Sequence, residues 1–499
     1  MKHSSFTPTG GATLFTGKYE INKVCSLPSP EGFEIELFSD GSAVLFAATP
    51  RAEKYALSQT KKMTGKELPC GKYAFVPEFA VRGIIEGFYG NPWTVDERRR
   101  LLSALSDRGM NSYFYGPKDD PFHRDRWDEL YGENDADTLK TLISIAGENL
   151  MDFRYMLAPG LSIRYSSSED REKLHAKYAQ VMGFGVKKFG LLLDDLESAQ
   201  LYEEDARVYP RQVDAHIDLV NDVYDHITGL DKDASLIVCP TQYWGRTNQE
   251  YLTALGRGIR PGCELFYTGP YICSDELTCD FARRFYADTG KKLIWWDNYP
   301  VNDMEMVDEL HLRPVSGREK GLGACCEGLV SNPMELAESS LVPLLTVADY
   351  LWNSSAYDPA ESRSEALAQV CPGYEKEVCV LSELCYKSCL EREGHHFEFA
   401  RPRGENPDFE RALSAGAYPL WQYLSFCLNS LEKLSRSGLK LVRECERWIN
   451  TAKIFCRGGI ALLERGEGEL LRAYLYENED IMKREARRLL DIFEKQSKI

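Results

Sequence analysis

Residues 189–197 read Phe-Gly-Leu-Leu-Leu-Asp-Asp-Leu-Glu, an apolar run that ends in two adjacent aspartates, Asp194 and Asp195. A short apolar run without alternation is typical of a strand buried on both faces, as in a parallel sheet. The two acids fall where such a strand leaves its sheet. Because neighbouring residues on a regular strand point to opposite faces, both carboxylates can face one site only where the chain turns. The stretch predicts a buried strand with a polar site at its carboxyl end.

Two interpretations of the acid pair are open on these residues alone. The plain structural one is a helix N-cap followed by a solvated acid. The functional one starts from the cost of burying carboxylates and from the fact that two close acids do not ionise independently. One of them then keeps its proton to a higher pH, which suits general acid–base chemistry on an acetal bond.

The same kind of apolar run repeats on both sides of this stretch, and most runs are followed by an amphipathic segment. Strands are predicted at 81–88, 111–115, 155–158, 189–193, 235–239, 264–268, 292–296 and 322–329. Helices are predicted at 94–108, 126–149, 168–187, 210–229, 248–256 and 275–289. Eight strands alternating with helices predict an α/β fold, a (β/α)8 TIM barrel, and an open doubly wound sheet is the alternative. The connection between the seventh and eighth strands, residues 300–320, is short and contains Pro and Gly. One helix is therefore expected to be missing or degenerate there.

Different patterns flank the predicted barrel, which we place at residues 79–352. Residues 1–78 form a small α/β accessory domain in this interpretation, with a hairpin of 34–38 and 43–46 followed by a helix at 51–62. After Trp352 strand signals disappear, and apolar residues recur at three- and four-residue intervals. Residues 353–499 are therefore predicted to be an α-helical bundle, with helices at 364–391, 408–435, 438–464 and 467–496.

Charge and cysteine content narrow the function classes. The formal net charge is -17, so general binding to nucleic acid or anionic membrane is not expected. No stretch approaches the roughly 20 apolar residues of a membrane helix, and the start lacks the apolar core of a secretory signal. The 15 cysteines are scattered without a Cys-x-x-Cys pair; Cys325 and Cys326 fall inside an expected strand, and Cys385 and Cys389 on one helix face. We expect reduced, buried thiols, no metal, no cofactor and a cytoplasmic location.

Polar and aromatic residues gather at the expected carboxyl ends of six strands, where a barrel enzyme has its active site. Aromatic faces suit the C–H face of a sugar, and carboxylate, amide and ammonium groups bind its hydroxyls. We therefore predict a carbohydrate site at the barrel mouth. Its candidate segments are 86–93, 116–120, 194–195, 239–244, 295–299 with Asp303, and 331–333.

Several of these segments resemble glycoside hydrolase family 84, the hyaluronidase-like β-N-acetylglucosaminidases or O-GlcNAcases, in their bacterial form. The segments that carry the resemblance are 82–93 (RGIIEGFYGNPW), 115–120 (YGPKDD), 193–195 (LDD), 239–243 (CPTQY), 267–270 (YTGP), 296–298 (WDN) with Asp303, and 331–333 (SNP). The resemblance covers about residues 79–352. Tyr267 departs from it, because many members have Trp there, and this change is expected to alter what lies beyond the sugar.

The resemblance implies substrate-assisted retaining catalysis, in which the 2-acetamido oxygen of the substrate attacks its own anomeric carbon and forms an oxazoline. No protein nucleophile is then needed, so the two acids can be neighbours. Asp194 would orient the acetamido N–H, and Asp195 would act as acid and then base. By the same resemblance, the groups that would bind the sugar are Tyr243, Asn298 and Trp296 at the acetamido group, and Lys118, Asp303, Asn332 and the Gly83 carbonyl at the hydroxyls.

The expected function is a retaining exo-β-N-acetylglucosaminidase that acts on N-acetylglucosamine-bearing glycans or glycoproteins. Two alternatives stay open: a glycan-binding module without turnover, and an endo-acting hyaluronidase, which shares the chemistry. The sequence assigns no oligomeric state.

Overall fold

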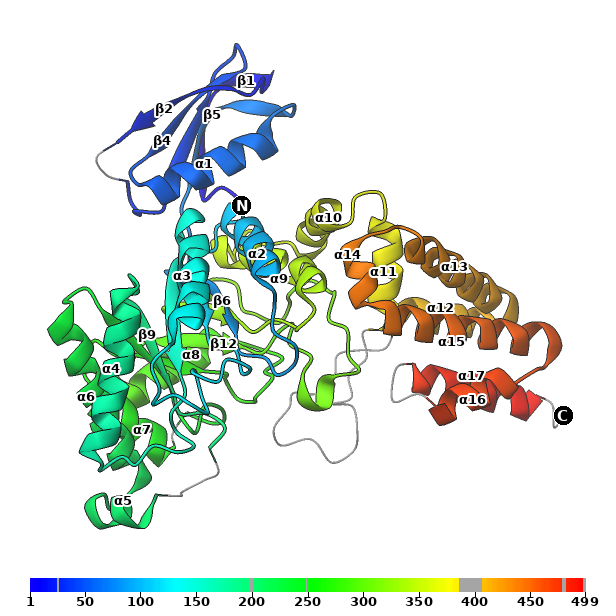
Figure 1. Cartoon of the computed structure of the whole chain (residues 1–499). Coiled ribbons are helices and arrows are strands. Elements are labelled where there is room, and N and C mark those ends of the chain that lie inside the picture. Colours follow the sequence, from blue (N-terminus) through cyan, green and yellow to red (C-terminus); the bar gives the residue numbers. More distant parts are fainter. Residues whose placement is uncertain (25–26, 197–200, 248, 386–405, 478–481, 497–499) are drawn as a thin grey trace. The chain divides into compact units, whose positions relative to one another are not determined.

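The computed structural model of the chain describes residues 1–24, 27–196, 201–247, 249–385, 406–477 and 482–496 (Figure 1). The chain divides into two compact units. One contains residues 1–298, 316–332 and 347–358, and the other contains 299–315, 333–346 and 359–499. Within the described ranges, no helix combines the length and the apolar character that a bilayer span requires.

Eight parallel strands close into a barrel in chain order, which confirms the predicted (β/α)8 fold. Seven of the predicted strands begin and end within a few residues of the observed ones. The strands are β6 (Val81–Glu86), β7 (Ser112–Tyr115), β8 (Asp152–Leu157), β9 (Lys188–Leu192), β10 (Ser235–Cys239), β11 (Glu264–Tyr267), β12 (Leu293–Asp297) and β13 (Gly328–Ser331). The helices between them are α2 (Val95–Asp107), α3 (Glu133–Glu148), α4 (Ser168–Gly183), α5 (Glu203–Val208), α6 (Gln212–Leu230), α7 (Glu250–Gly258) and α8 (Cys279–Thr289).

Apolar side chains from all eight strands fill the barrel, among them Phe114, Met156 and Trp296. Gly190 of β9 is part of this packing, because a Cβ at that position would overlap the Met156 sulfur. The buried strands therefore read as near-continuous apolar runs, as expected for a parallel sheet covered on both sides.

The eighth strand begins later than predicted, at Gly328 rather than residue 322. Residues 322–324 form a short 3-10 helix, η2 (Leu322–Ala324), which follows Gly321 in the left-handed conformation at φ 80°. Between β12 and β13, where every residue is described, the helical elements are η2 and a second 3-10 helix, η1 (Met304–Met306). The expected loss of one barrel helix is thus confirmed.

One cysteine pair contradicts the prediction that all thiols are reduced, because Cys279 and Cys325 form a disulfide. They are 46 residues apart in sequence. They meet because residue 277 pairs with Gly317 and Glu319 through main-chain hydrogen bonds. Most of the remaining cysteines in the described ranges are buried. Cys389, predicted to share a helix face with Cys385, lies outside the described residues.

The N-terminal domain is a five-stranded sheet in the order β1-β5-β3-β4-β2, with α1 across one face (Figure 1). The predicted hairpin and helix are confirmed as the antiparallel pair β3–β4 and as α1. Its elements are β1 (Ser5–Leu14), β2 (Lys18–Lys23), β3 (Phe33–Leu37), β4 (Ser42–Ala47), α1 (Pro50–Met63) and β5 (Glu67–Phe75). Trp352, from the far end of the barrel sequence, is fully buried in the same core and contacts Phe33 and Tyr55.

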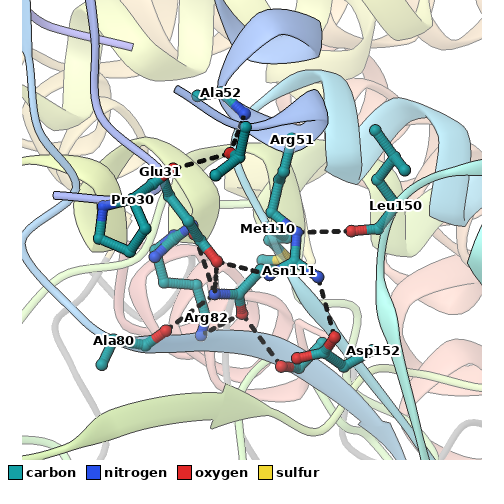
Figure 2. Close-up of polar contacts among 12 residues, drawn as sticks. Pro30, Glu31, Arg51, Ala52, Ala80, Arg82, Met110, Asn111, Leu150 and Asp152 are labelled. Carbon is teal, nitrogen blue, oxygen red and sulfur yellow. Dashed lines mark hydrogen bonds and ion pairs between the residues drawn. The ribbon is translucent and has the colours of Figure 1, made fainter. Parts of the chain in front are cut away.

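A buried charge cluster joins this domain to the amino ends of the barrel strands (Figure 2). The Glu31 carboxylate, in the loop before β3, accepts hydrogen bonds from Arg82 of β6, Arg51 of α1 and the Asn111 amide. Arg51 also donates to Asp152 at the start of β8 at 2.9 Å. Arg82 is 1% exposed, so the Glu31 carboxylate offsets the cost of removing its guanidinium from water.

From Pro359 onward the described residues of the second unit are mostly helical, which agrees with the C-terminal helical region that the sequence predicts. Its core contains buried side chains such as Leu424, Leu431 and Phe455. α9 (Ala337–Trp352) divides between the two units. The other helices are α10 (Pro359–Val370), α11 (Glu375–Leu384), α12 (Pro407–Ala415), α13 (Ala417–Ser435), α14 (Lys440–Glu444), α15 (Glu446–Arg465), α16 (Glu469–Glu477) and α17 (Lys483–Gln496). The parts of the predicted helices at 386–391 and 478–481 lie outside the described residues.

Candidate active site

The chain turns at the acid pair, as the sequence requires if both acids face one site. β9 ends at Leu192, and the Leu193 N–H still bonds to the Cys239 carbonyl of the next strand at 2.9 Å. Asp195 then adopts the left-handed conformation at φ 53°. A non-glycine residue there costs about 1–3 kcal/mol and is found mostly at functional sites. This turn replaces the alternation of the strand, so Asp194 and Asp195 can share neighbours.

Lys118 is the neighbour that the two acids share. Its ammonium lies 3.4 Å from Asp194 Oδ2 and 3.7 Å from Asp195 Oδ2. Burial alone would lower the pKa of Lys118, but the two carboxylates outweigh it and raise that pKa above its ordinary value. The lysine therefore remains a cation, which offsets the charge of two acids held close together.

Two tyrosine hydroxyls donate to Asp195. Tyr89, after β6, reaches Oδ2 at 2.9 Å, and Tyr243, after β10, reaches Oδ1 at 3.3 Å. Burial, and then the nearby acids, raise the pKa of Tyr243, so its hydroxyl stays protonated and can donate. The side chain of Asp195 is 33% exposed, whereas that of Asp194 is 9% exposed. The two acids thus have different surroundings, the condition under which neighbouring carboxyl groups take different roles.

A second polar group lies at the ends of β12 and β13. Asn298 Oδ1 accepts from the Trp296 indole N–H at 2.9 Å and from the Asn332 amide at 3.0 Å. Its own amide donates to the Ile272 carbonyl at 2.9 Å. Trp296 belongs to the barrel cluster against which Tyr243 packs, so this group and the acids border one apolar interior.

Three buried side-chain oxygens after β9, β10 and β13 have no hydrogen-bond partner in the described part of the chain. They are the Thr241 hydroxyl and two acceptors, Asp194 Oδ1 and Asn332 Oδ1. A buried acceptor without a donor costs about 1–3 kcal/mol, so such atoms call for an external partner. A ligand that offers an amide N–H to one and a hydroxyl to the other would satisfy both. A 2-acetamido sugar carries these groups.

Seven of the nine predicted residues are thus brought to the strand ends: Asp194, Asp195, Lys118, Tyr243, Trp296, Asn298 and Asn332. Gly83 is not, because it lies within β6, where a Cβ would overlap the Ser112 carbonyl of β7. Asp303 precedes η1 in the second unit, so its place at the site stays a prediction.

Sequence reasoning placed Gly87 and Tyr89 in a candidate segment but gave them no role, and it missed Arg124. Gly87 follows β6, and a Cβ there would lie 2.7 Å from the Trp296 ring and 3.5 Å from Asn332 Oδ1. The missed signal was the alternation of β6, which turns Ile85 and Gly87 inward and Glu86 outward. Glu86 is fully buried and paired with Arg98 of α2, so it supports packing.

Tyr267 does not face the barrel interior, where the sequence led us to expect an effect beyond the bound sugar. It is fully buried and packs against Phe281 and Phe285 of α8, on the outer side of the barrel. The change from Trp therefore alters packing beneath α8 rather than the surroundings of a bound sugar.

A sequence model of the NAGidase family, described as beta-N-acetylglucosaminidase, matches residues 82–383. The chain belongs to this family. The match spans the whole barrel and all the residues discussed above, and it confirms the resemblance to glycoside hydrolase family 84.

Curated relatives and solved structures agree with this assignment. The Protein O-GlcNAcases of Rattus norvegicus and Mus musculus are each 32% identical over 274 residues, which is 54% of this chain and 29% of theirs. The match thus spans less than a third of those relatives. Among structures, an O-GlcNAc hydrolase variant of Thermobaculum terrenum is 30% identical, with a TM-score of 0.74 over 84% of this chain and 94% of that one. The structure of CpGH84B, 21% identical, shares the fold with a TM-score of 0.77 over 99% and 96%.

Proposed function

We propose that this protein is a retaining exo-β-N-acetylglucosaminidase that releases terminal β-linked N-acetylglucosamine through an oxazoline intermediate. The observation that carries the proposal is the pairing of two adjacent acids with unlike surroundings. The Asp194 side chain is 9% exposed, and its buried Oδ1 has no partner among the described residues. The Asp195 side chain is 33% exposed and lies between two tyrosine hydroxyls. An acid that only holds an amide and an acid that moves protons need such different environments.

In the first step, the acetamido oxygen of the substrate forms a bond to the anomeric carbon. The bond to the leaving oxygen breaks, and that oxygen keeps the electron pair and takes the proton of Asp195. Asp194 Oδ1 accepts the acetamido N–H and stabilises the positive charge that develops there. In the second step, water attacks the anomeric carbon and gives a proton to Asp195, and the acetamide re-forms.

Other residues would hold the sugar. Lys118 donates to one hydroxyl and Asn332 Oδ1 accepts from another. Tyr243 and Asn298 hydrogen-bond the acetamido group beside the Trp296 ring. Asp303 and the Gly83 carbonyl are proposed at the hydroxyls from their sequence motifs alone. Gly87 is added as a glycine that keeps the space beside the Trp296 ring open.

Turnover of aryl β-N-acetylglucosaminides tests the proposal. The wild-type chain should release the aryl group, and a thiazoline that mimics the oxazoline should inhibit it tightly. Asp195→Asn should slow substrates with poor leaving groups far more than those with good ones, whereas Asp194→Asn should slow both alike. Sugar binding by calorimetry without any product would mean a binding module instead.

The natural substrate class proposed is N-acetylglucosamine-bearing glycans or glycoproteins, because relatives are named O-GlcNAcase and O-GlcNAc hydrolase. Product sizing on a hyaluronan oligomer separates exo from endo action, and monosaccharide release from a glycopeptide supports protein substrates. A cytoplasmic location is kept as part of the proposal, although the Cys279–Cys325 disulfide removes one of its arguments.

A further inference from the structure

We infer that Arg124 and Tyr89 are positioning residues that fix one oxygen of Asp195, so that its other oxygen carries the proton that is exchanged during catalysis. This inference rests on the proposed function and adds to it two residues that act on the acid rather than on the sugar.

The hydrogen bonds of the pair run in one direction. An Arg124 Nη1–H donates to the Tyr89 hydroxyl oxygen at 2.9 Å, and that hydroxyl lies 2.9 Å from Asp195 Oδ2. A guanidinium can only donate, so the tyrosine oxygen is the acceptor of the first bond. The single hydroxyl proton of Tyr89 is then directed to Asp195. The nearby charge of Arg124 strengthens this second bond.

Tyr89 is held on its ring as well as on its hydroxyl. The Lys118 ammonium lies 5.1 Å from the centre of the Tyr89 ring, within the range of a cation–π contact. Lys118 and Arg124 both come from the loop between β7 and α3. This loop therefore sets the position of Tyr89, which itself comes from the segment after β6.

The loop that carries Arg124 is anchored next to it. His123 is fully buried, its Nδ1 lies 2.7 Å from the Met156 carbonyl, and its own carbonyl accepts the Ala158 N–H at 2.9 Å. Burial lowers the pKa of His123 to about 3, so the ring is neutral and Nδ1 carries the hydrogen that reaches the carbonyl. Arg124 thus extends from a fixed point at the end of β8.

Asp195 needs such an external support. It lies outside the strand in a left-handed turn, and a third of its side chain is exposed, so packing alone does not fix its rotamer. The Tyr243 contact to Oδ1, at 3.3 Å, is longer than the Tyr89 contact to Oδ2. In the proposed reaction Tyr243 turns to the acetamido group, which frees Oδ1 for the mobile proton while Tyr89 keeps Oδ2 in place.

The test compares leaving groups, because a defect in proton donation is seen only where the leaving group needs a proton. Tyr89→Phe and Arg124→Gln should lower kcat/KM about 10- to 100-fold for phenyl β-N-acetylglucosaminide, and less than about threefold for the 3,4-dinitrophenyl glycoside. Arg124→Lys should restore part of the loss. The control is Arg126→Gln, in the same loop. Arg126 is half-exposed, pairs with Glu129 and lies over the Phe122 ring. The variant should match wild type on both substrates.

The double variant separates this inference from a general loss of structure. If Arg124 acts through Tyr89, Tyr89→Phe with Arg124→Gln should lose no more than Tyr89→Phe alone. Equal losses on the two substrates, no loss on either, or multiplied losses in the double variant would overturn the inference. Absence of wild-type turnover on the dinitrophenyl substrate would instead overturn the proposed function.

Discussion

The indole N–H of Trp296 donates to the side-chain oxygen of Asn298, two residues later, at 2.9 Å. Asn332, from the next strand, donates to the same oxygen at 3.0 Å. One amide therefore fixes both an aromatic ring and a second amide at the barrel mouth, and it is itself held by the Ile272 carbonyl.

Asn298→Ala should lower kcat/KM about 10- to 100-fold. The change removes three hydrogen bonds, each worth about 0.5–1.5 kcal/mol, and leaves the Trp296 ring and the Asn332 amide unsupported. Kinetics on an aryl N-acetylglucosaminide measure the loss, with most of it in KM. Asn134→Ala, at an exposed position early in α3, is the control; a wild-type KM for Asn298→Ala would argue against this support.

Alanine at Gly83, within β6, and at Gly87, just after it, should have different effects. At Gly87 the added methyl group meets the end of the Trp296 ring, so KM should rise about tenfold with little change in Tm. At Gly83 it meets the main chain of β7, so stability should fall by about 1–3 kcal/mol. Thermal unfolding and kinetics on both variants measure these effects. A raised KM for Gly83→Ala, with a loss of stability for Gly87→Ala instead, would contradict this prediction.

Glu31→Gln should destabilise the first unit by about 3–5 kcal/mol at neutral pH, because it leaves the buried Arg82 without its charge partner. Burial alone would raise the pKa of Glu31, but Arg82 and Arg51 lower it below its ordinary value of 4.5. The stabilisation is therefore present above about pH 4.5 and is lost as pH falls through the lower folded-state pKa.

Urea unfolding of wild type and variant between pH 7 and pH 3 measures this dependence. The difference between them should shrink as the pH falls. Glu20→Gln, on the exposed strand β2, is the matched control and should leave the unfolding free energy unchanged. A difference that stays constant with pH would show that the charge of Glu31 is not what matters.

Removing the disulfide with Cys279→Ser and Cys325→Ser should lower stability by about 2–4 kcal/mol, because the bond closes a long loop in the unfolded chain. Unfolding with and without a reductant checks the value. Wild type under reducing conditions should behave like the double variant. If the reductant has no effect on wild type, the bond does not form in solution.

The barrel could be predicted because its strands are buried on both faces and therefore apolar throughout. The sheet strands β1 and β2 could not, because most of their residues are exposed and β1 contains Pro8, Gly10 and Gly11. The disulfide could not be predicted, because its two cysteines are 46 residues apart in sequence. The start of β13 was misjudged because the apolar run before it belongs to a 3-10 turn.

At the candidate site, the acids, Lys118 and the Trp296–Asn298–Asn332 group could be predicted because each follows or ends an expected barrel strand. The periodic patterns that identify strands and helices are absent from loops, so they did not predict Arg124. Its position depends on how His123 is anchored. Gly83 and Gly87 share a motif and, four residues apart, the same direction on the strand. They differ in position, because Gly83 lies within β6 and Gly87 follows its end.

The burial of Trp352 among Phe33 and Tyr55 has a consequence for biosynthesis. As the ribosome makes the chain, the N-terminal sheet emerges first, but the indole that fills its interior is translated only after the last barrel strand. The interior of the sheet is therefore completed only after the whole barrel sequence has been translated.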